Sequence, residues 1–219
     1  MMSGALIRLL LGIMISGPEA QQQPIGKTLR VTRCTLNGMP RMAVVVLSPD
    51  ITVAYDAREC RLALAWKGEF DQRTWASSGD RSAMSTLRAE RWYYQASDTS
   101  IWQVEQNGQP VFPAVRFRGY TFGENNVKFH FSLTLPGGEE VKGTEVLQTH
   151  FGQNDELILQ RRIEFDDMPP KTRISLPLRG EVPWDRFETL GTAGVGVDQE
   201  TYVLTFKKDG YSICGFAFN

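Results

Sequence analysis

This chain is poor in the side chains that most often carry chemistry or bind metals. Its 219 residues include two histidines, His130 and His150, and three cysteines. Neither histidine is spaced with cysteines or carboxylates in the way that metal ligands usually are. There is no Cys-x-x-Cys-His sequence for covalent attachment of haem. We therefore predict no metal site and no cofactor.

Recurrent catalytic motifs are missing as well. No Gly-x-Ser-x-Gly sequence occurs, so the nucleophile turn of many serine hydrolases is excluded. Glycines between Gly191 and Gly196 are not ordered as in a dinucleotide-binding loop. Carboxylates occur in neighbouring pairs such as Asp166-Asp167, but such pairs in turns are usually solvated. The sequence favours a non-catalytic protein and leaves open, as the alternative, a carbohydrate-active enzyme that uses a carboxylate pair with His130.

The chain also lacks an excess of charge of one sign and a long apolar run. Its formal net charge is -1 and its pI about 6.2, so no global field recruits nucleic acid. The apolar run from Leu9 to Ile15 is shorter than the ~20 residues that a membrane-spanning helix needs. We therefore predict no nucleic-acid partner and no transmembrane span in the mature chain.

That short run does have the layout of a secretory signal. Arg8 precedes it, Gly17-Pro18 ends it, and Ala20 offers a small residue for cleavage. We predict a signal peptide over residues 1–20, a polar spacer over 21–27 and a single domain over 28–219, in a periplasmic or extracellular location. An uncleaved anchor or a misassigned start codon are the alternatives.

Apolar and polar residues alternate with a period of two through most of the remaining chain. The clearest strand runs from Val127 to Leu135, and residues 51–56 and 61–66 are expected to pair across a turn. Asn107-Gly108 is a strong signal for a two-residue hairpin. We predict an all-β fold, a large antiparallel β-sandwich of roughly a dozen strands. Residues 67–90 are expected to be mostly irregular, with one possible helical turn at 82–88.

Aromatic residues in and beside the expected loops are the best functional signal, because flat rings bind sugars and other planar ligands by stacking. The alternative is that tryptophans such as Trp66, Trp92 and Trp102 fill the core. If a binding face exists, we expect Asp71 and Arg73 to supply its polar contacts, and the stacking residues to be Phe70, Trp75, Trp92, Tyr94 and Trp184.

Three cysteines in an exported protein allow one disulfide at most. Cys60 lies at the turn between the strands 51–56 and 61–66, and Cys34 precedes the first core strand. We therefore favour a Cys34–Cys60 disulfide, although three unpaired cysteines, with Cys214 in the core, would also fit.

Two stretches carry a family resemblance. The first holds Tyr55-Asp56-Ala57, Cys60 and then Trp66-Lys67-Gly68-Glu69-Phe70-Asp71, and the second holds Phe117-Arg118-Gly119-Tyr120 and Phe129-His130-Phe131. Over residues 41–165 the chain resembles a β-rich domain of large exported planctomycete and verrucomicrobial proteins. Those proteins often also carry cytochrome c or sugar-dehydrogenase-like propeller modules, which this chain lacks. The resemblance implies export and a β-rich fold, but no particular activity.

Together these observations predict an exported, non-catalytic binding or accessory module. The expected ligand is a carbohydrate or another exported protein. Besides the enzyme alternative, a structural subunit of a secreted or redox complex stays open.

Overall fold

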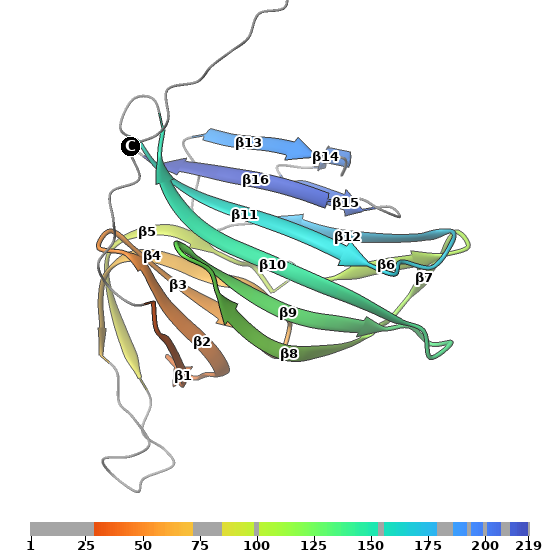
Figure 1. The fold of residues 1–219 in the computed structure, drawn as a ribbon, viewed down its shortest axis with the longest axis horizontal. Helices are drawn as coiled ribbons and strands as arrows, with labels where there is room; N and C mark the ends of the chain where they lie inside the picture. The colour runs from red at the N-terminus through yellow and green to blue at the C-terminus, as the bar shows by residue number, and fades with distance from the viewer. Residues whose placement is uncertain are drawn as a thin grey trace, which may run out of the picture.

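The computed structural model describes residues 29–71, 85–98, 101–152, 156–178, 186–191, 194–198, 201–206 and 211–218, with backbone only for 186–202 and 211–218. These residues form strands and no helix, which confirms the predicted all-β class (Figure 1). The strands are β1 Val31–Leu36, β2 Met39–Ser48, β3 Ile51–Asp56, β4 Arg61–Asp71, β5 Thr86–Gln95, β6 Gln103–Gln106, β7 Gln109–Val111, β8 Ala114–Phe122, β9 Asn126–Thr134, β10 Glu140–Phe151, β11 Leu157–Asp166, β12 Thr172–Leu178, β13 Arg186–Gly191, β14 Gly194–Asp198, β15 Thr201–Phe206 and β16 Tyr211–Phe218. The predicted signal peptide and spacer lie outside the described residues, which include no helix that could cross a membrane.

The strands form three sheets in which neighbours are antiparallel. The first sheet has the order β1-β2-β3-β4-β5, the second β13-β16-β11-β10-β9-β8, and the third β14-β15-β12-β6-β7. The predicted pairing of strands 51–56 and 61–66 is confirmed by β3 and β4. Hairpin β6–β7 turns at Asn107-Gly108, whose φ angles of 52° and 78° are the left-handed values that this turn requires.

The first sheet is longer than the sequence indicated. Strand β4 continues to Asp71 and β5 begins at Thr86, so Lys67–Asp71 pair with Thr86–Arg91 instead of lying in an irregular segment. The expected helical turn at 82–88 is therefore wrong for its described residues, which are extended. Gly68 permits this pairing, because it has a φ of 136° and an added Cβ would lie 2.2 Å from the backbone oxygen of Arg88.

This first sheet also closes on itself, and we call it the rolled sheet. Ser85, just before β5, donates its N–H to the carbonyl of Thr35 at 3.0 Å and accepts from the N–H of Asn37 at 3.2 Å. The two bonds form a parallel bridge to Leu36. A parallel closure is expected, because the first and fifth strands of an antiparallel meander run in the same direction. The interior of the roll holds Cys34, Leu36, Met42, Val44, Ala54, Ala63, Leu64 and Trp66.

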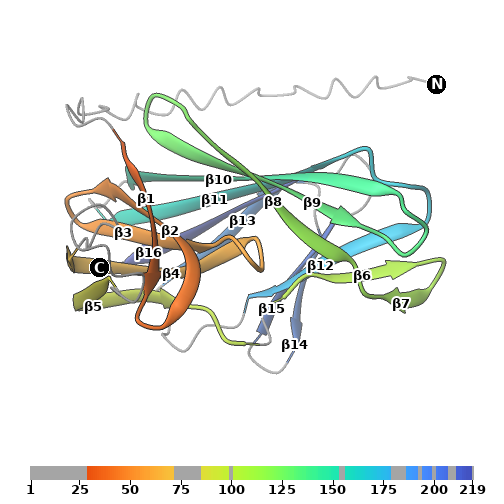
Figure 2. The same ribbon diagram turned by 90° about the horizontal axis from the view of Figure 1, so that it is seen from below.

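The outer face of the rolled sheet packs into a larger core. There it shares one hydrophobic cluster with the second and third sheets, including Val53 from β3, Phe129 from β9 and Ile174 from β12. Figure 2 shows the rolled sheet and the third sheet side by side against the six-stranded second sheet. The molecule is thus a sandwich in which one layer is divided between two sheets.

Candidate binding groove

The stacking face expected from the sequence does not form among the described residues. Tyr94 is only 1% exposed and belongs to the large core, while Trp92 and Phe70 are partly buried against the interior of the roll. Trp66 and Trp92 lie with ring centroids 6.4 Å apart. Curling of the sheet is the physical reason, because it turns the face that carries Phe70 and Trp92 inwards.

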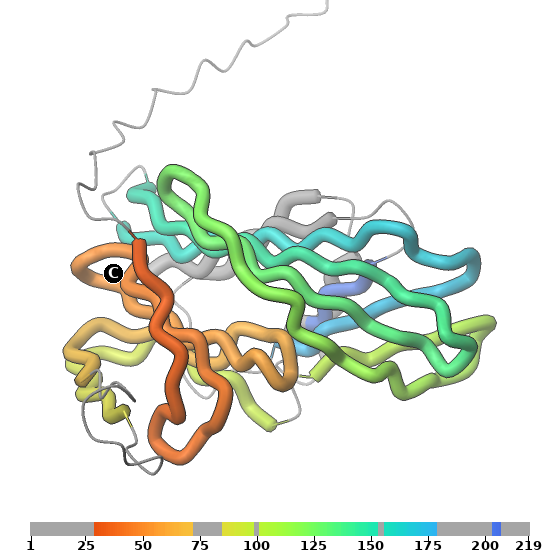
Figure 3. The backbone as a smooth tube through the Cα atoms, turned by 60° about the horizontal axis from the view of Figure 1, so that its bottom comes forward, coloured from red at the N-terminus to blue at the C-terminus, as the bar shows by residue number. Residues whose placement is uncertain are grey.

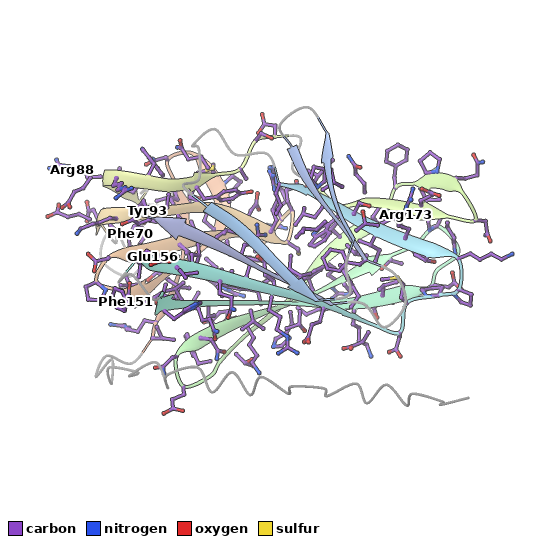
Figure 4. The ribbon with its side chains drawn as sticks, turned by 90° about the horizontal axis from the view of Figure 1, so that it is seen from above. Phe70, Arg88, Tyr93, Phe151, Glu156 and Arg173 are labelled. Atoms are coloured by element: carbon purple, nitrogen blue, oxygen red, sulfur yellow. The ribbon has the colours of Figure 1, made fainter. Side chains whose placement is uncertain are left out.

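The other residues of the predicted binding face are not brought together either. Asp71 is exposed at the end of β4, and Figure 4 shows Phe70 near the end of the molecule opposite Arg173. Arg73, Trp75 and Trp184 lie outside the described residues. Trp66 and Trp102 are buried, so the alternative that tryptophans fill the core is confirmed for these two residues.

The structure does not contain the favoured Cys34–Cys60 disulfide. Both residues are buried free thiols. They lie on opposite faces of the rolled sheet, Cys34 in its interior and Cys60 in the large core, so a bond between them would have to pass through the sheet. Burial raises the pKa of Cys60 to about 12, with a smaller contribution from the Asp56 carboxylate. It also raises the pKa of Cys34.

His130 lies on the outer face of the six-stranded sheet between two hydroxyls. Its Nε2 is 2.9 Å from Oγ1 of Thr121, and its Nδ1 is 3.3 Å from Oγ1 of Thr144. Both ring nitrogens therefore face neutral partners rather than the carboxylate that a general acid–base pair would use. Within the described part of the chain, no three histidines, cysteines or carboxylates are grouped to hold a metal ion.

The large core contains a buried ion pair that was not predicted from the sequence. Nε of Arg161 donates to Oε1 of Glu145 at 2.7 Å, and both side chains are fully buried. The guanidinium carbon of Arg161 also lies 5.8 Å from the ring centroid of Tyr94. The period-two alternation does place both residues on the inward face. Glu145 follows Val141 and Gly143 on the inward-facing positions of β10, and Arg161 lies between inward-facing Leu159 and Ile163 on β11.

A concave site lies where the rolled sheet meets β8. It is a groove of about 770 Å³, which we call the arginine groove, and this volume falls in the usual range for ligand sites. Figure 3 shows hairpin β1–β2 beside β8, and residues of β8 form the other wall of the groove. Its lining residues are Arg33, Cys34, Thr35, Pro40, Arg41, Met42, Ala43, Ala57, Arg58, Val115, Arg116 and Phe117.

The described residues that line this groove include four arginines and no carboxylate. Arg33 comes from β1, Arg41 from β2, Arg58 from the β3–β4 turn and Arg116 from β8, and all four side chains are exposed. Only Arg58 has a described ion pair, with Glu59 at 3.2 Å, and that pair is itself exposed. A concentration of positive charge therefore exists locally in a chain whose formal net charge is -1.

Local backbone structure brings these arginines together. The carboxylate of Asp56 accepts from the N–H groups of Arg58 and Glu59 at 2.8 and 3.2 Å and so fixes the β3–β4 turn. The carbonyl of Arg41, a residue with a left-handed φ of 58°, accepts from the N–H of Ala57 at 3.1 Å. The turn that carries Arg58 is thereby held against the start of β2.

Arg33 is held by aromatic rings from the opposite wall. Its guanidinium carbon lies 5.8 Å from the ring centroid of Phe117 and 5.9 Å from that of Tyr120. Such cation–π contacts orient the planar guanidinium and leave its N–H groups free to bind an anion in its plane. Arg33 therefore spans the two layers of the sandwich at the groove.

Searches with this chain matched no family model, no curated protein and no solved structure. The resemblance to exported planctomycete and verrucomicrobial proteins therefore stays a prediction, and the groove is interpreted from its own chemistry.

Proposed function

We propose that this protein is an exported, non-catalytic binding module whose arginine groove holds an anionic ligand. The observation that carries the proposal is the lining of the groove, whose described residues include four arginines and no acidic residue. Guanidinium groups bind carboxylates, sulfates and phosphates through paired hydrogen bonds, which is why arginine predominates at such sites. Export rests on the signal-like pattern of residues 1–20.

Binding is favoured over catalysis by the chemistry of the groove. Cys34 is its one lining residue with a nucleophilic thiol, and burial raises the pKa of that thiol. A raised pKa keeps the group protonated, whereas the thiolate is the reactive form. The remaining lining residues offer positive charge, apolar surface and one hydroxyl, which suit recognition of an anion.

Binding of polyanions to the purified chain tests this function. We expect fluorescently labelled polyglutamate to bind and polylysine not to bind, as measured by fluorescence anisotropy. Affinity should fall as salt rises, because exposed charges are screened over about 10 Å at 0.1 M salt. Polygalacturonate and polyphosphate extend the test to a carbohydrate, the ligand class expected from the sequence, and to a phosphate ligand.

A matched pair of variants locates the binding. The double variant R33Q/R116Q removes one guanidinium from each wall and should weaken binding about 10-fold or more, equivalent to about 1.4 kcal/mol. The control R162Q/R173Q also removes two guanidinium groups, from β11 and β12, where Arg162 contacts Glu164 and Arg173 contacts Glu105 (Figure 4), and should leave binding unchanged. Absence of binding to all three polyanions would contradict the proposal, as would equal losses in the two variants.

A further inference from the structure

One wall of the arginine groove is formed by β8, the last strand of the six-stranded sheet. From β8 the groove is lined by three consecutive residues, Val115, Arg116 and Phe117. Successive side chains of a strand point to opposite faces of the sheet, so contact with all three reaches both faces of β8. Because β8 is an edge strand among the described residues, this contact places the groove beside its outer edge.

The edge of β8 that faces the groove is available for pairing. β8 is the last strand of the six-stranded sheet, and β9 is its only strand partner among the residues that the structure describes. The segment from Ala114 to Phe117 pairs regularly with β9, before the register shifts between Phe117 and Gly119. An edge strand of this kind presents a row of backbone N–H and C=O groups that an added strand can pair with.

From these two features we infer that the ligand is an extended acidic peptide, which adds a strand to the free edge of β8. This inference rests on the proposed binding of anions in the arginine groove. Backbone pairing supplies affinity without sequence preference, and the side chains of the added strand supply selectivity. Acidic side chains on one face would lie beside Arg116, and those on the other face would meet the arginines of the rolled sheet.

The groove suits a peptide better than a polysaccharide. Sugar rings bind proteins largely by stacking on exposed aromatic faces, and in the described part of the chain Phe117 is the only aromatic residue that lines the groove. The guanidinium of Arg33 already lies over the ring of Phe117. An extended peptide needs no such face, because the strand edge and the arginines provide its contacts.

A labelled octapeptide that repeats Glu-Glu-Val-Val, with blocked termini, tests strand addition because it carries carboxylates on both faces of the added strand. Its control is the same peptide N-methylated at every residue, which keeps all four carboxylates but has no backbone N–H to donate. We expect the first peptide to bind, the methylated peptide to bind at least 10-fold more weakly, and R33Q/R116Q to weaken binding of the first peptide about 10-fold. We also expect the first peptide to slow hydrogen exchange in residues 114–118, measured by mass spectrometry.

The outcomes separate this inference from the proposed function. If both peptides bind equally well and R33Q/R116Q weakens both, the groove binds anions without strand addition and only the inference is overturned. If polygalacturonate binds more tightly than the unmethylated peptide, the peptide is the wrong ligand class and the inference is again overturned. If no polyanion or peptide binds, the proposed function and the inference of strand addition are both overturned. Both arginines are exposed, and R33Q removes only the exposed cation–π contacts with Phe117 and Tyr120, so the unfolding midpoint of R33Q/R116Q should fall only slightly.

Discussion

The pair formed by Glu145 and Arg161 shows how much one charged residue can matter in this core. Each side chain is fully buried, so each has lost its hydration and depends on the other. Removing one partner of such a pair typically costs 3–5 kcal/mol, because an uncompensated charge is left in a medium of low dielectric constant. Replacing both partners with apolar residues of similar volume is often neutral or stabilising.

We therefore predict that E145L and R161M each lower the free energy of unfolding by about 3–5 kcal/mol. The double variant E145L/R161M should recover most of that loss. Urea unfolding followed by tryptophan fluorescence measures all three free energies. The account would be wrong if the double variant lost as much stability as the sum of the two single variants.

The positions of many core residues could be predicted from the sequence, and the exceptions have physical causes. Period-two alternation placed Phe129 and Phe131 in the core correctly. Glu145 and Arg161 also occupy inward-facing positions of this alternation. A charged residue is nevertheless expected at the surface unless its partner is known, and the sequence alone does not show that β10 pairs with β11. The four arginines of the groove come from separate elements, so no local pattern links them.

At the scale of elements, closure of the rolled sheet depends on a single residue outside the regular strands. Ser85 makes both backbone hydrogen bonds that join β1 to the segment leading into β5. Those bonds close a sheet whose interior contains Trp66 and Leu36, both fully buried. Sequence patterns predicted β3 and the first part of β4, but they predicted neither the pairing of residues 67–71 with 86–91 nor the closure of the sheet. The closure pairs residues about fifty positions apart through one bridge.

We expect S85P to open the roll, since proline has no N–H to donate to the carbonyl of Thr35. Loss of one buried backbone hydrogen bond typically costs about 1–3 kcal/mol. Hydrogen exchange should then accelerate at the amide of Asn37, which donates to the carbonyl of Ser85, while amides of β9 and β10 keep their protection. S85A serves as the control, because it keeps the backbone donor. Unchanged exchange at Asn37 in S85P would contradict this role.

Across the whole molecule, the two described cysteines make stability dependent on pH in the alkaline range. The pKa of Cys60 is about 12 in the folded protein, against an ordinary value of 9.0 in the unfolded chain. Between these pH values the unfolded chain releases a proton that the folded protein keeps. The contribution of this thiol to the free energy of unfolding is therefore fully present below pH 9 and is lost as the pH rises towards 12. Cys34 acts in the same direction.

We predict that the free energy of unfolding falls between pH 9 and pH 10 by about 1 kcal/mol for each fully shifted thiol. C60A should reduce this slope, and its residual slope should reflect Cys34. Urea titrations at pH 8, 9 and 10 provide the measurement. The tyrosines whose pKa burial also raises have an ordinary pKa of 10.0 and add to the loss mainly above this interval. An identical slope in C60A would show that Cys60 is not responsible.

Trp102 stands between β5 and β6, where the chain passes from the rolled sheet to the third sheet. Its indole N–H donates to the carbonyl of Cys60 at 3.0 Å, and its ring lies 5.2 Å from Phe131 and 6.4 Å from Phe206. One side chain thus joins all three sheets at the place where the chain crosses from the first to the third. Proteolysis at that crossing would give fragments that each expose part of a shared aromatic core, and neither would be an independent folding unit.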